Sequence, residues 1–380
     1  MNIKPSPMKR LLSITFFVLI AQLATAQLIH VGTYSVRGSE GIYTLRFDPK
    51  AGTLTPVGST KNAKSPSFLA IRPGGNQLYS VNEADGAGPT KFGSVGAYGR
   101  DPKTGLLTPI NEKSSFGRAP CHISIDKTGH WAIIANYGGS WRVYGLLPDG
   151  SLGAVADSLS FLGKGPNTNR QERAHVHSAT ISDDNRFVYI ADLGTDKLHC
   201  YNLNAQTGKL TPNQTPVMMV KPGSGPRHFA IHPNGRFAYL AEELTSSVAV
   251  FSRDPQTGSL TLMQDRVASL PADFTGENTH ADIHTDPSGR NLYVSNRGHN
   301  SLSIFTVAPD GSIKLIGHQP TMGAKPRNFM VHPSGQWILV ANQDTDTIVV
   351  FRRDPKTGLL TDTGEQEKVP SPVCVIISPE

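Results

Sequence analysis

One strand pattern recurs along almost the whole chain and predicts an all-β fold, a seven-bladed β-propeller. Each copy has an apolar run, a Gly/Asn turn, two further apolar runs, and then a turn that in many copies reads DPxTGxLT. Repeats of roughly 50 residues with four short strands each are typical of propellers. Six copies begin at Pro66, Pro120, Val176, Pro226, His280 and Pro326.

A seventh copy is divided between the two ends of the chain, which predicts how the ring closes. Residues 372–379 (PVCVIISP) match only the first strand of a repeat, and residues 28–35 (LIHVGTYS) match the second. Pairing of these two segments completes the last blade and removes exposed strand edges. We therefore expect a single closed domain over residues 27–380, with about 51 residues per blade.

The strands within a blade are short apolar runs separated by turn residues. Turns such as Pro233-Asn234-Gly235 place glycine where the backbone needs a positive φ. No window has a sustained 3.6-residue period, so we expect very little helix. In the fourth copy the four expected strands cover residues 228–233, 237–243, 247–253 and 259–263.

Residues 1–26 have the features of a secretory signal peptide. A basic start with Lys4, Lys9 and Arg10 is followed by an apolar run over residues 11–23 and by the small residues Ala24-Thr25-Ala26. The apolar run is too short to span a membrane as a helix. We expect an exported protein, periplasmic or secreted, that has no membrane association once the leader is removed.

The composition argues against several classes of partner. Three of the 36 Lys and Arg residues lie in the leader, which leaves 33 against 30 Asp and Glu. No basic run remains, so we expect no nucleic-acid binding. Cys121, Cys200 and Cys374 have no metal-ligand spacing and form no even-numbered disulfide framework. We expect buried thiols and no cofactor.

Departures from the repeat mark a candidate site at one mouth of the central channel. The position after the opening residue of the first strand is His177, Arg227 or Arg327 in three of the copies. The position at the end of the second strand is Glu243 or Arg297 in two of them. Antiparallel first and second strands start and end on the same face of the ring. We expect these five side chains to converge.

The chemistry of this set suits an anionic substrate and proton transfer. Paired arginines hold phosphate or carboxylate in bidentate fashion, and a histidine beside a carboxylate can move a proton. Irregular insertions at 163–175, 271–280 and 84–94 emerge on the same face, where long loops commonly bind ligands. The competing interpretation is a polar ring that only holds water or joins the blades.

Three further residues have alternative interpretations. His175 and His177 form an HxH pair, which is half of a metal site, but no carboxylate completes the spacing. Asp282 and His284 alternate on one face of a strand, which fits either a hydrogen-bonded brace or a binding role. We expect His175, Asp282 and His284 to join Arg327 in binding substrate, and we expect no metal.

Three segments closely resemble the seven-bladed lactonase family. They are GPRHFAIHPNGRFAYLAEELTSSVAVF (225–251), ADIHTDPSGRNLYVSNRGHNSLSIF (281–305) and PRNFMVHPSGQWILVANQDTDTIVVF (326–351). The family includes bacterial propeller-type 6-phosphogluconolactonases and fungal carboxymuconate-lactonizing enzymes. The resemblance covers nearly all of the chain after the leader, and it implies lactone chemistry at the channel mouth.

The resemblance also implies roles for individual residues. In the muconate branch a His, two Arg and a Glu serve the site, and the matching positions here are His177, Arg227, Glu243 and Arg297. For a lactonase, Glu243 or His177 would activate water, one arginine would stabilise the oxyanion, and Arg297 or Arg327 would anchor an anionic group. Burial would raise the pKa of a carboxylate base. A GxSxG motif is absent, so we expect no serine nucleophile.

The sequence therefore predicts a monomeric carboxylic-ester hydrolase that opens a small anionic sugar lactone and resembles 6-phosphogluconolactonase. Two alternatives stay open: a cycloisomerase of the carboxymuconate type, and a non-catalytic propeller that presents a binding surface. Export is at odds with the cytoplasmic phosphogluconolactonases of the family, so an unphosphorylated aldonolactone is a second candidate substrate. The sequence does not decide between these lactones.

Overall fold

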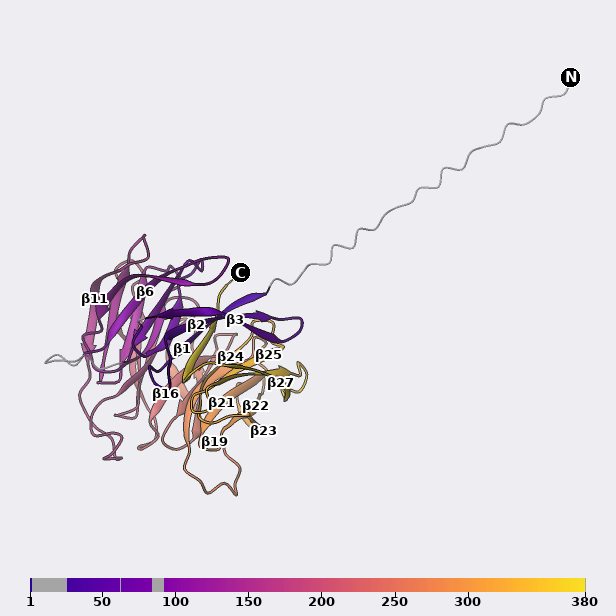
Figure 1. The fold of residues 1–380 in the computed structure, drawn as a ribbon. Coiled ribbons are helices and arrows are strands. Elements are labelled where there is room, and N and C mark those ends of the chain that lie inside the picture. The colour runs from indigo at the N-terminus through magenta and orange to yellow at the C-terminus, as the bar shows by residue number, and fades with distance from the viewer. Residues whose placement is uncertain (2–25, 62, 84–91, 380) are drawn as a thin grey trace.

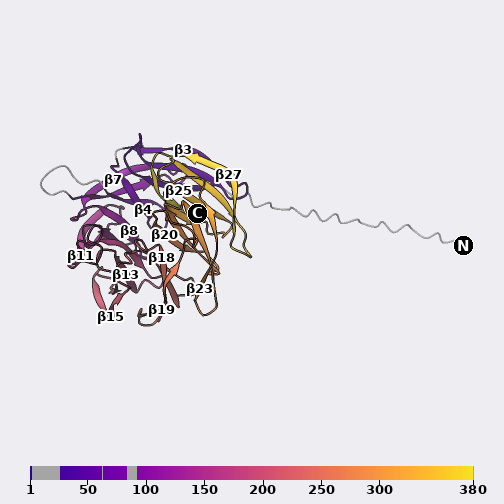
Figure 2. The same ribbon diagram turned by 90° about the horizontal axis from the view of Figure 1, so that it is seen from below.

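The computed structural model describes Met1 and residues 26–61, 63–83 and 92–379. The described residues form seven four-stranded antiparallel sheets arranged as blades around a channel, and no helix occurs among them (Figure 1, Figure 2). The expected seven-bladed propeller is confirmed. Most of the expected leader, and residues 84–91 of the third insertion, lie outside the described residues.

Each blade runs from an inner first strand to an outer fourth strand, as the labelled outer strands β7, β11, β15, β19 and β23 in Figure 2 illustrate. The first three blades comprise β4 (Pro66–Ile71), β5 (Gln77–Asn82), β6 (Ser94–Arg100), β7 (Leu107–Ser114); β8 (Pro120–Ile125), β9 (Trp131–Asn136), β10 (Ser140–Leu146), β11 (Leu152–Ser160); and β12 (Val176–Ile181), β13 (Phe187–Asp192), β14 (Lys197–Leu203), β15 (Leu210–Met219). The next three comprise β16 (Pro226–Ile231), β17 (Phe237–Glu242), β18 (Ser247–Arg253), β19 (Leu260–Ala268); β20 (Thr279–Thr285), β21 (Asn291–Arg297), β22 (Ser301–Val307), β23 (Ile313–Pro320); and β24 (Pro326–Val331), β25 (Trp337–Asn342), β26 (Thr347–Arg353), β27 (Leu360–Lys368).

The seventh blade joins the two ends of the chain. It comprises β28 (Pro372–Ile377), β1 (Gln27–Thr33), β2 (Gly41–Asp48) and β3 (Thr53–Lys61), in that order. β28 pairs antiparallel with β1, from Ile29 opposite Ile377 to Thr33 opposite Pro372. The yellow C-terminal strand therefore lies against the indigo N-terminal blade (Figure 1). The expected mode of ring closure is confirmed.

The hydrophobic core is a ring of interfaces between neighbouring blades. At four of these interfaces, a tyrosine of the second strand donates its hydroxyl hydrogen to a glycine carbonyl in a turn of the next blade. Gly258, for example, has a φ of +74°, and a Cβ there would lie 2.4 Å from the ring of Phe187, so the turn needs glycine. The pairs are Tyr79–Gly150, Tyr189–Gly258, Tyr239–Gly311 and Tyr293–Gly358, at 2.7–3.2 Å.

The cysteines are placed as the sequence predicts. All three are buried free thiols within or beside strands.

No helix among the described residues is long and apolar enough to cross a membrane.

Four buried histidines make the stability of the fold sensitive to acid. Burial lowers the pKa of His30 and His280 to about 3 and of His199 and His228 to about 4. The unfolded chain takes up these protons near pH 6.5, so stability is lost as the pH falls from there towards the folded-state values. Each histidine then costs about 2 kcal/mol at pH 5. His284, whose pKa is raised beside Asp282, opposes this trend.

We therefore expect the melting temperature to fall markedly between pH 7.5 and pH 5. The measurement is a series of thermal melts followed by circular dichroism, and His30→Gln should make the pH dependence shallower by removing one of the groups that takes up a proton on unfolding. A melting temperature that stays constant across this range would contradict the expectation.

Candidate active site

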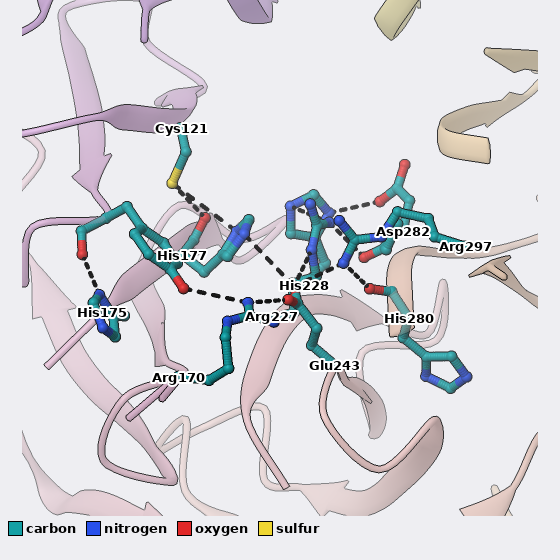
Figure 3. Close-up of polar contacts among 12 residues, drawn as sticks. Cys121, Arg170, His175, His177, Arg227, His228, Glu243, His280, Asp282 and Arg297 are labelled. Carbon is teal, nitrogen blue, oxygen red and sulfur yellow. Dashed lines mark hydrogen bonds and ion pairs between the residues drawn. The ribbon is translucent and has the colours of Figure 1, made fainter. Parts of the chain in front are cut away.

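Three of the predicted site residues, His177, Arg227 and Arg297, gather around the buried carboxylate of a fourth, Glu243 (Figure 3). Arg227 Nε lies 2.9 Å and Arg297 Nη2 lies 3.0 Å from Glu243 Oε2. His177 Nε2 lies 3.9 Å from the same oxygen. The side chains of Glu243, Arg227 and His177 are only 2–5% exposed. The convergence of these four residues, drawn from three consecutive blades, was predicted from the sequence.

A backbone irregularity aims the arginines and the histidine into the channel. The pairing of first and second strands shifts register just after the opening residue, between Val176 and Ser178, between Pro226 and Phe229, and between Pro326 and Asn328. Such bulges bend the strand and redirect the extra side chain. The side chains at these bulges are His177, Arg227 and Arg327.

Arg327 lies beside this group rather than on Glu243. Its guanidinium carbon lies 5.2 Å from the centre of the Tyr34 ring, and the Tyr34 hydroxyl donates to Glu83 at 3.0 Å. Arg327, Arg227 and Glu83 help to line a small cavity of about 10 Å³, which is room for about one water molecule. Arg227 contacts Glu243 and also lines this cavity, so the cavity adjoins the cluster around Glu243.

A fourth cation at the site was not predicted individually. Arg170, from the 163–175 insertion, forms an ion pair through Nη2 with Glu243 Oε1 and lies 3.4 Å from the Tyr137 hydroxyl (Figure 3). The insertion itself was recognised as a binding-loop candidate on this face. The connections between the fourth strand of one blade and the first strand of the next differ in length and sequence, so the internal alignment carried no signal for Arg170.

The electrostatics of Glu243 correct one expectation. Burial alone would raise the pKa of its carboxyl, but Arg297, Arg227 and Arg170 outweigh burial and hold the pKa well below its usual range. Glu243 is therefore a carboxylate at all physiological pH values, and the expectation of a raised pKa was wrong. The sign changes because three guanidinium groups, rather than apolar side chains, surround the carboxylate.

His177 is a neutral imidazole at this site. Burial, and then the positive charge of Arg227, lower its pKa well below the usual value. Its Nδ1 lies 4.0 Å from the sulfur of Cys121. Burial, followed by the charge of Glu83, raises the pKa of the Cys121 thiol, which keeps the thiol protonated and unsuited to nucleophilic attack.

Arg297 has an unused donor in the buried cluster. Its Nη2 also donates to the carbonyl oxygen of His280 at 2.7 Å, while its Nε is buried without a partner among the described residues. Burial lowers the pKa of Arg297 to about 9, which still leaves the guanidinium charged at neutral pH. A buried N–H without a partner costs free energy, and a ligand oxygen would remove that cost.

His175 supports the loop and Tyr137. Its ring stacks on Tyr137 with 4.3 Å between centroids. Its Nδ1 lies 2.8 Å from the Tyr137 carbonyl oxygen, and its Nε2 lies 3.1 Å from Glu172 Oε2. Both ring nitrogens are thus engaged within the protein.

Asp282 and His284 lie on the other side of Arg227 from Glu243. His228 accepts from Arg227 through Nε2, so its Nδ1 carries the proton and donates to Asp282 at 2.7 Å. The second oxygen of Asp282 lies 2.9 Å from His284 Nε2. This arrangement matches the brace interpretation, because it links blades four and five behind Arg227.

A second and larger cavity lies apart from the Glu243 cluster. It has a volume of about 660 Å³, its walls include Ile125, Ile181 and Ile231, and Asp282 and His284 line it. His228 and Phe68 line both cavities and form the partition between them. Among the described residues, no group of three or more His, Cys, Asp or Glu side chains is arranged to hold a metal ion.

The comparisons with known proteins agree with this architecture. Residues 28–377 match the family described as "Lactonase, 7-bladed beta-propeller". A 6-phosphogluconolactonase of Bacillus subtilis (strain 168) is 35% identical over 348 residues, which covers 91% of this chain and 97% of the relative. A 6-phosphogluconolactonase of Formosa agariphila is 36% identical over 325 residues, which covers 84% and 90%.

A solved structure extends the similarity to three dimensions. The periplasmic gluconolactonase of Pseudomonas aeruginosa superposes with a TM-score of 0.86 and 33% identity, over 93% of this chain and 99% of that one. Sequence and structure therefore agree along the whole propeller, and the chain belongs to the seven-bladed β-propeller lactonase family.

Proposed function

We propose that this protein is a lactone hydrolase and that water opens the ring ester beside Glu243. The observation that carries this proposal is the cluster itself, in which a neutral His177 and a permanently ionised Glu243 lie among three guanidinium groups. Such a cluster offers a proton acceptor next to donors that stabilise negative charge. The names of the relatives, 6-phosphogluconolactonase and gluconolactonase, support the same reaction.

In the proposed reaction, His177 acts as the base. Both oxygens of Glu243 already accept from arginines, whereas His177 Nε2 is beyond hydrogen-bonding distance of Glu243. Water gives a proton to His177 as its oxygen bonds to the ester carbon, and the carbonyl electron pair moves onto oxygen. Arg227 stabilises this oxyanion, and Glu243 stabilises the imidazolium.

Collapse of the tetrahedral intermediate completes the reaction. The carbonyl re-forms, the bond from carbon to the ring oxygen breaks, and the imidazolium of His177 returns its proton to the leaving oxygen. The product is an open hydroxy acid. Arg297, with its unused Nε, and Arg327 are the proposed anchors for oxygens of the substrate.

The test is hydrolysis of 6-phosphogluconolactone and of gluconolactone, with spontaneous opening subtracted. Because the pKa of His177 lies well below about 6.5, we expect kcat/KM to stay flat between pH 6 and pH 8 and to fall only in more acid solution. His177→Asn should abolish most of this activity. Failure to open either lactone would favour the binding-module or cycloisomerase alternative.

We further propose that the protein is exported. The basic start and apolar run of residues 1–26 support this, and one structural neighbour is described as periplasmic. Mass spectrometry of the protein recovered from a periplasmic or culture fraction would show a chain that starts at Gln27. A cytoplasmic chain that retains Met1 would contradict the proposal.

A further inference from the structure

The loop above Glu243 carries a cation that is open to solvent. Arg170 is 39% exposed at its side chain, whereas its partner Glu243 is 3% exposed. Arg227 and Arg297, the other two cations on this carboxylate, are 2% and 13% exposed. Arg170 is therefore the most exposed of the three cations that contact Glu243.

The neighbouring residue holds Arg170 in place. Gln171 is fully buried, and its Nε2 donates to the Leu193 carbonyl and to Asp196 Oδ1, both at 2.8 Å. The backbone N–H of Asn167 donates to Gln171 Oε1 at 3.1 Å, which ties the loop to itself. A fixed cation loses little freedom when it binds a ligand, so this position is preorganised.

The charges at the mouth are unbalanced. Among the described residues, four guanidinium groups contact or lie near three carboxyl groups, those of Glu243, Glu83 and Asp282, and His177 is neutral. An excess of positive charge in a partly buried site favours an anion. The four guanidinium groups belong to Arg170, Arg227, Arg297 and Arg327.

Arg170 also has the donors that an anion needs. Its Nη2 contacts Glu243 and Tyr137, while its Nε and Nη1 have no hydrogen-bond acceptor among the described residues. The Nη2 of Arg297 also serves two acceptors, Glu243 and the His280 carbonyl, but the Arg297 side chain is only 13% exposed, against 39% for Arg170. The free N–H groups on Nε and Nη1 can each donate a charge-assisted hydrogen bond to a phosphate or carboxylate oxygen.

We propose that Arg170 is a specificity-determining residue that binds an anionic group of the lactone. That group is a phosphate or a carboxylate remote from the ring ester, and its recognition selects anionic lactones over neutral ones. This inference rests on the proposed lactone hydrolysis and extends it from the reaction to the class of substrate.

The test compares three lactones that differ in the remote group: 6-phosphogluconolactone, a glucaric acid lactone with a free carboxylate, and neutral gluconolactone. For Arg170→Ala, we expect the ratio of kcat/KM for an anionic lactone to that for the neutral one to fall by about tenfold, the effect of losing a charge-assisted hydrogen bond. Arg170→Lys should lower the ratio less, because it keeps the charge and loses the fork.

Arg173→Ala is the matched control. Arg173 lies in the same loop, its side chain is 59% exposed, and it pairs with Glu172, so its removal deletes the same charge without touching Glu243. We expect the ratio to stay unchanged in this variant. A fall in the ratio for only the phosphate or only the carboxylate lactone would identify which group Arg170 binds.

Two results would overturn the inference. One is an unchanged ratio in Arg170→Ala, and the other is an equal loss for all three lactones, which would show that Arg170 acts only through Glu243. If the unaltered protein opens none of the lactones, the hydrolase proposal fails. Calorimetric binding of 6-phosphogluconate and gluconate then tests Arg170 alone. The inference also fails unless Arg170→Ala weakens binding of 6-phosphogluconate and leaves binding of gluconate unchanged.

Discussion

Arg227→Ala is expected to lower kcat/KM for lactone opening by about a hundredfold to a thousandfold, the usual cost of removing a donor to an oxyanion. Arg227 is the residue that joins the parts of the site. It contacts Glu243, the Ala281 carbonyl and His228, and it lines the small cavity beside Glu83. Its loss also leaves the buried Glu243 with one fewer cation.

The control must separate catalysis from folding, because Arg227 is buried. Arg253 is a matched residue: it lies in the same blade, is also buried, and donates to the Tyr189 hydroxyl and the Gly235 carbonyl on the far face of the ring. Arg253→Ala should lower the melting temperature and leave kcat/KM nearly unchanged. Equal activity losses in the two variants, or full activity in Arg227→Ala, would rule out the proposed role.

Deletion of residues 371–380 is expected to prevent formation of a closed ring. The deletion removes β28, with the buried side chains of Val373, Cys374 and Val375, and it breaks the ladder with β1. Lost apolar burial and hydrogen bonds together cost about 5–10 kcal/mol, which is comparable with the whole stability of a typical domain. We expect the cooperative thermal transition in near-ultraviolet circular dichroism to disappear.

Two controls sharpen this experiment. Deletion of residues 379–380 alone keeps β28 and should leave the melt close to that of the full chain. Addition of a synthetic peptide of residues 371–380 should restore the transition of the longer deletion, because the peptide can pair with the free edge of β1. A truncated chain that melts like the full protein would show that ring closure does not depend on β28.

The fold could be predicted because every blade repeats the same pattern of apolar runs and turns. Turns such as Asp254 to Gly258 follow an apolar run in many copies. The copy that is divided between the two ends of the chain shows how the ring closes. The sequence did not show that a tyrosine such as Tyr189 would bond a turn glycine of the next blade. That contact depends on the distance between blades, which is set by packing and not by the repeat.

The site was only partly predictable for similar reasons. Alignment of the repeats brought His177, Arg227, Glu243 and Arg297 together, because their positions follow from strand direction alone. The ion pair with Arg170 depends on the path of a loop whose length and sequence differ from those of the equivalent connections between other blades. The low pKa of Glu243 depends on that contact and on the neighbouring arginines. The direction of the pKa shift therefore could not be derived from burial.

The order in which the last blade is assembled also limits when the protein can become active. β28 is synthesised after all the other described strands, and until it is available one edge of β1 is unpaired and the mouth cannot take its final shape. Folding of the nascent chain therefore stays incomplete through synthesis. If the protein is exported as proposed, this delay would keep the polypeptide unfolded enough for transport and would postpone assembly of the site until after transport.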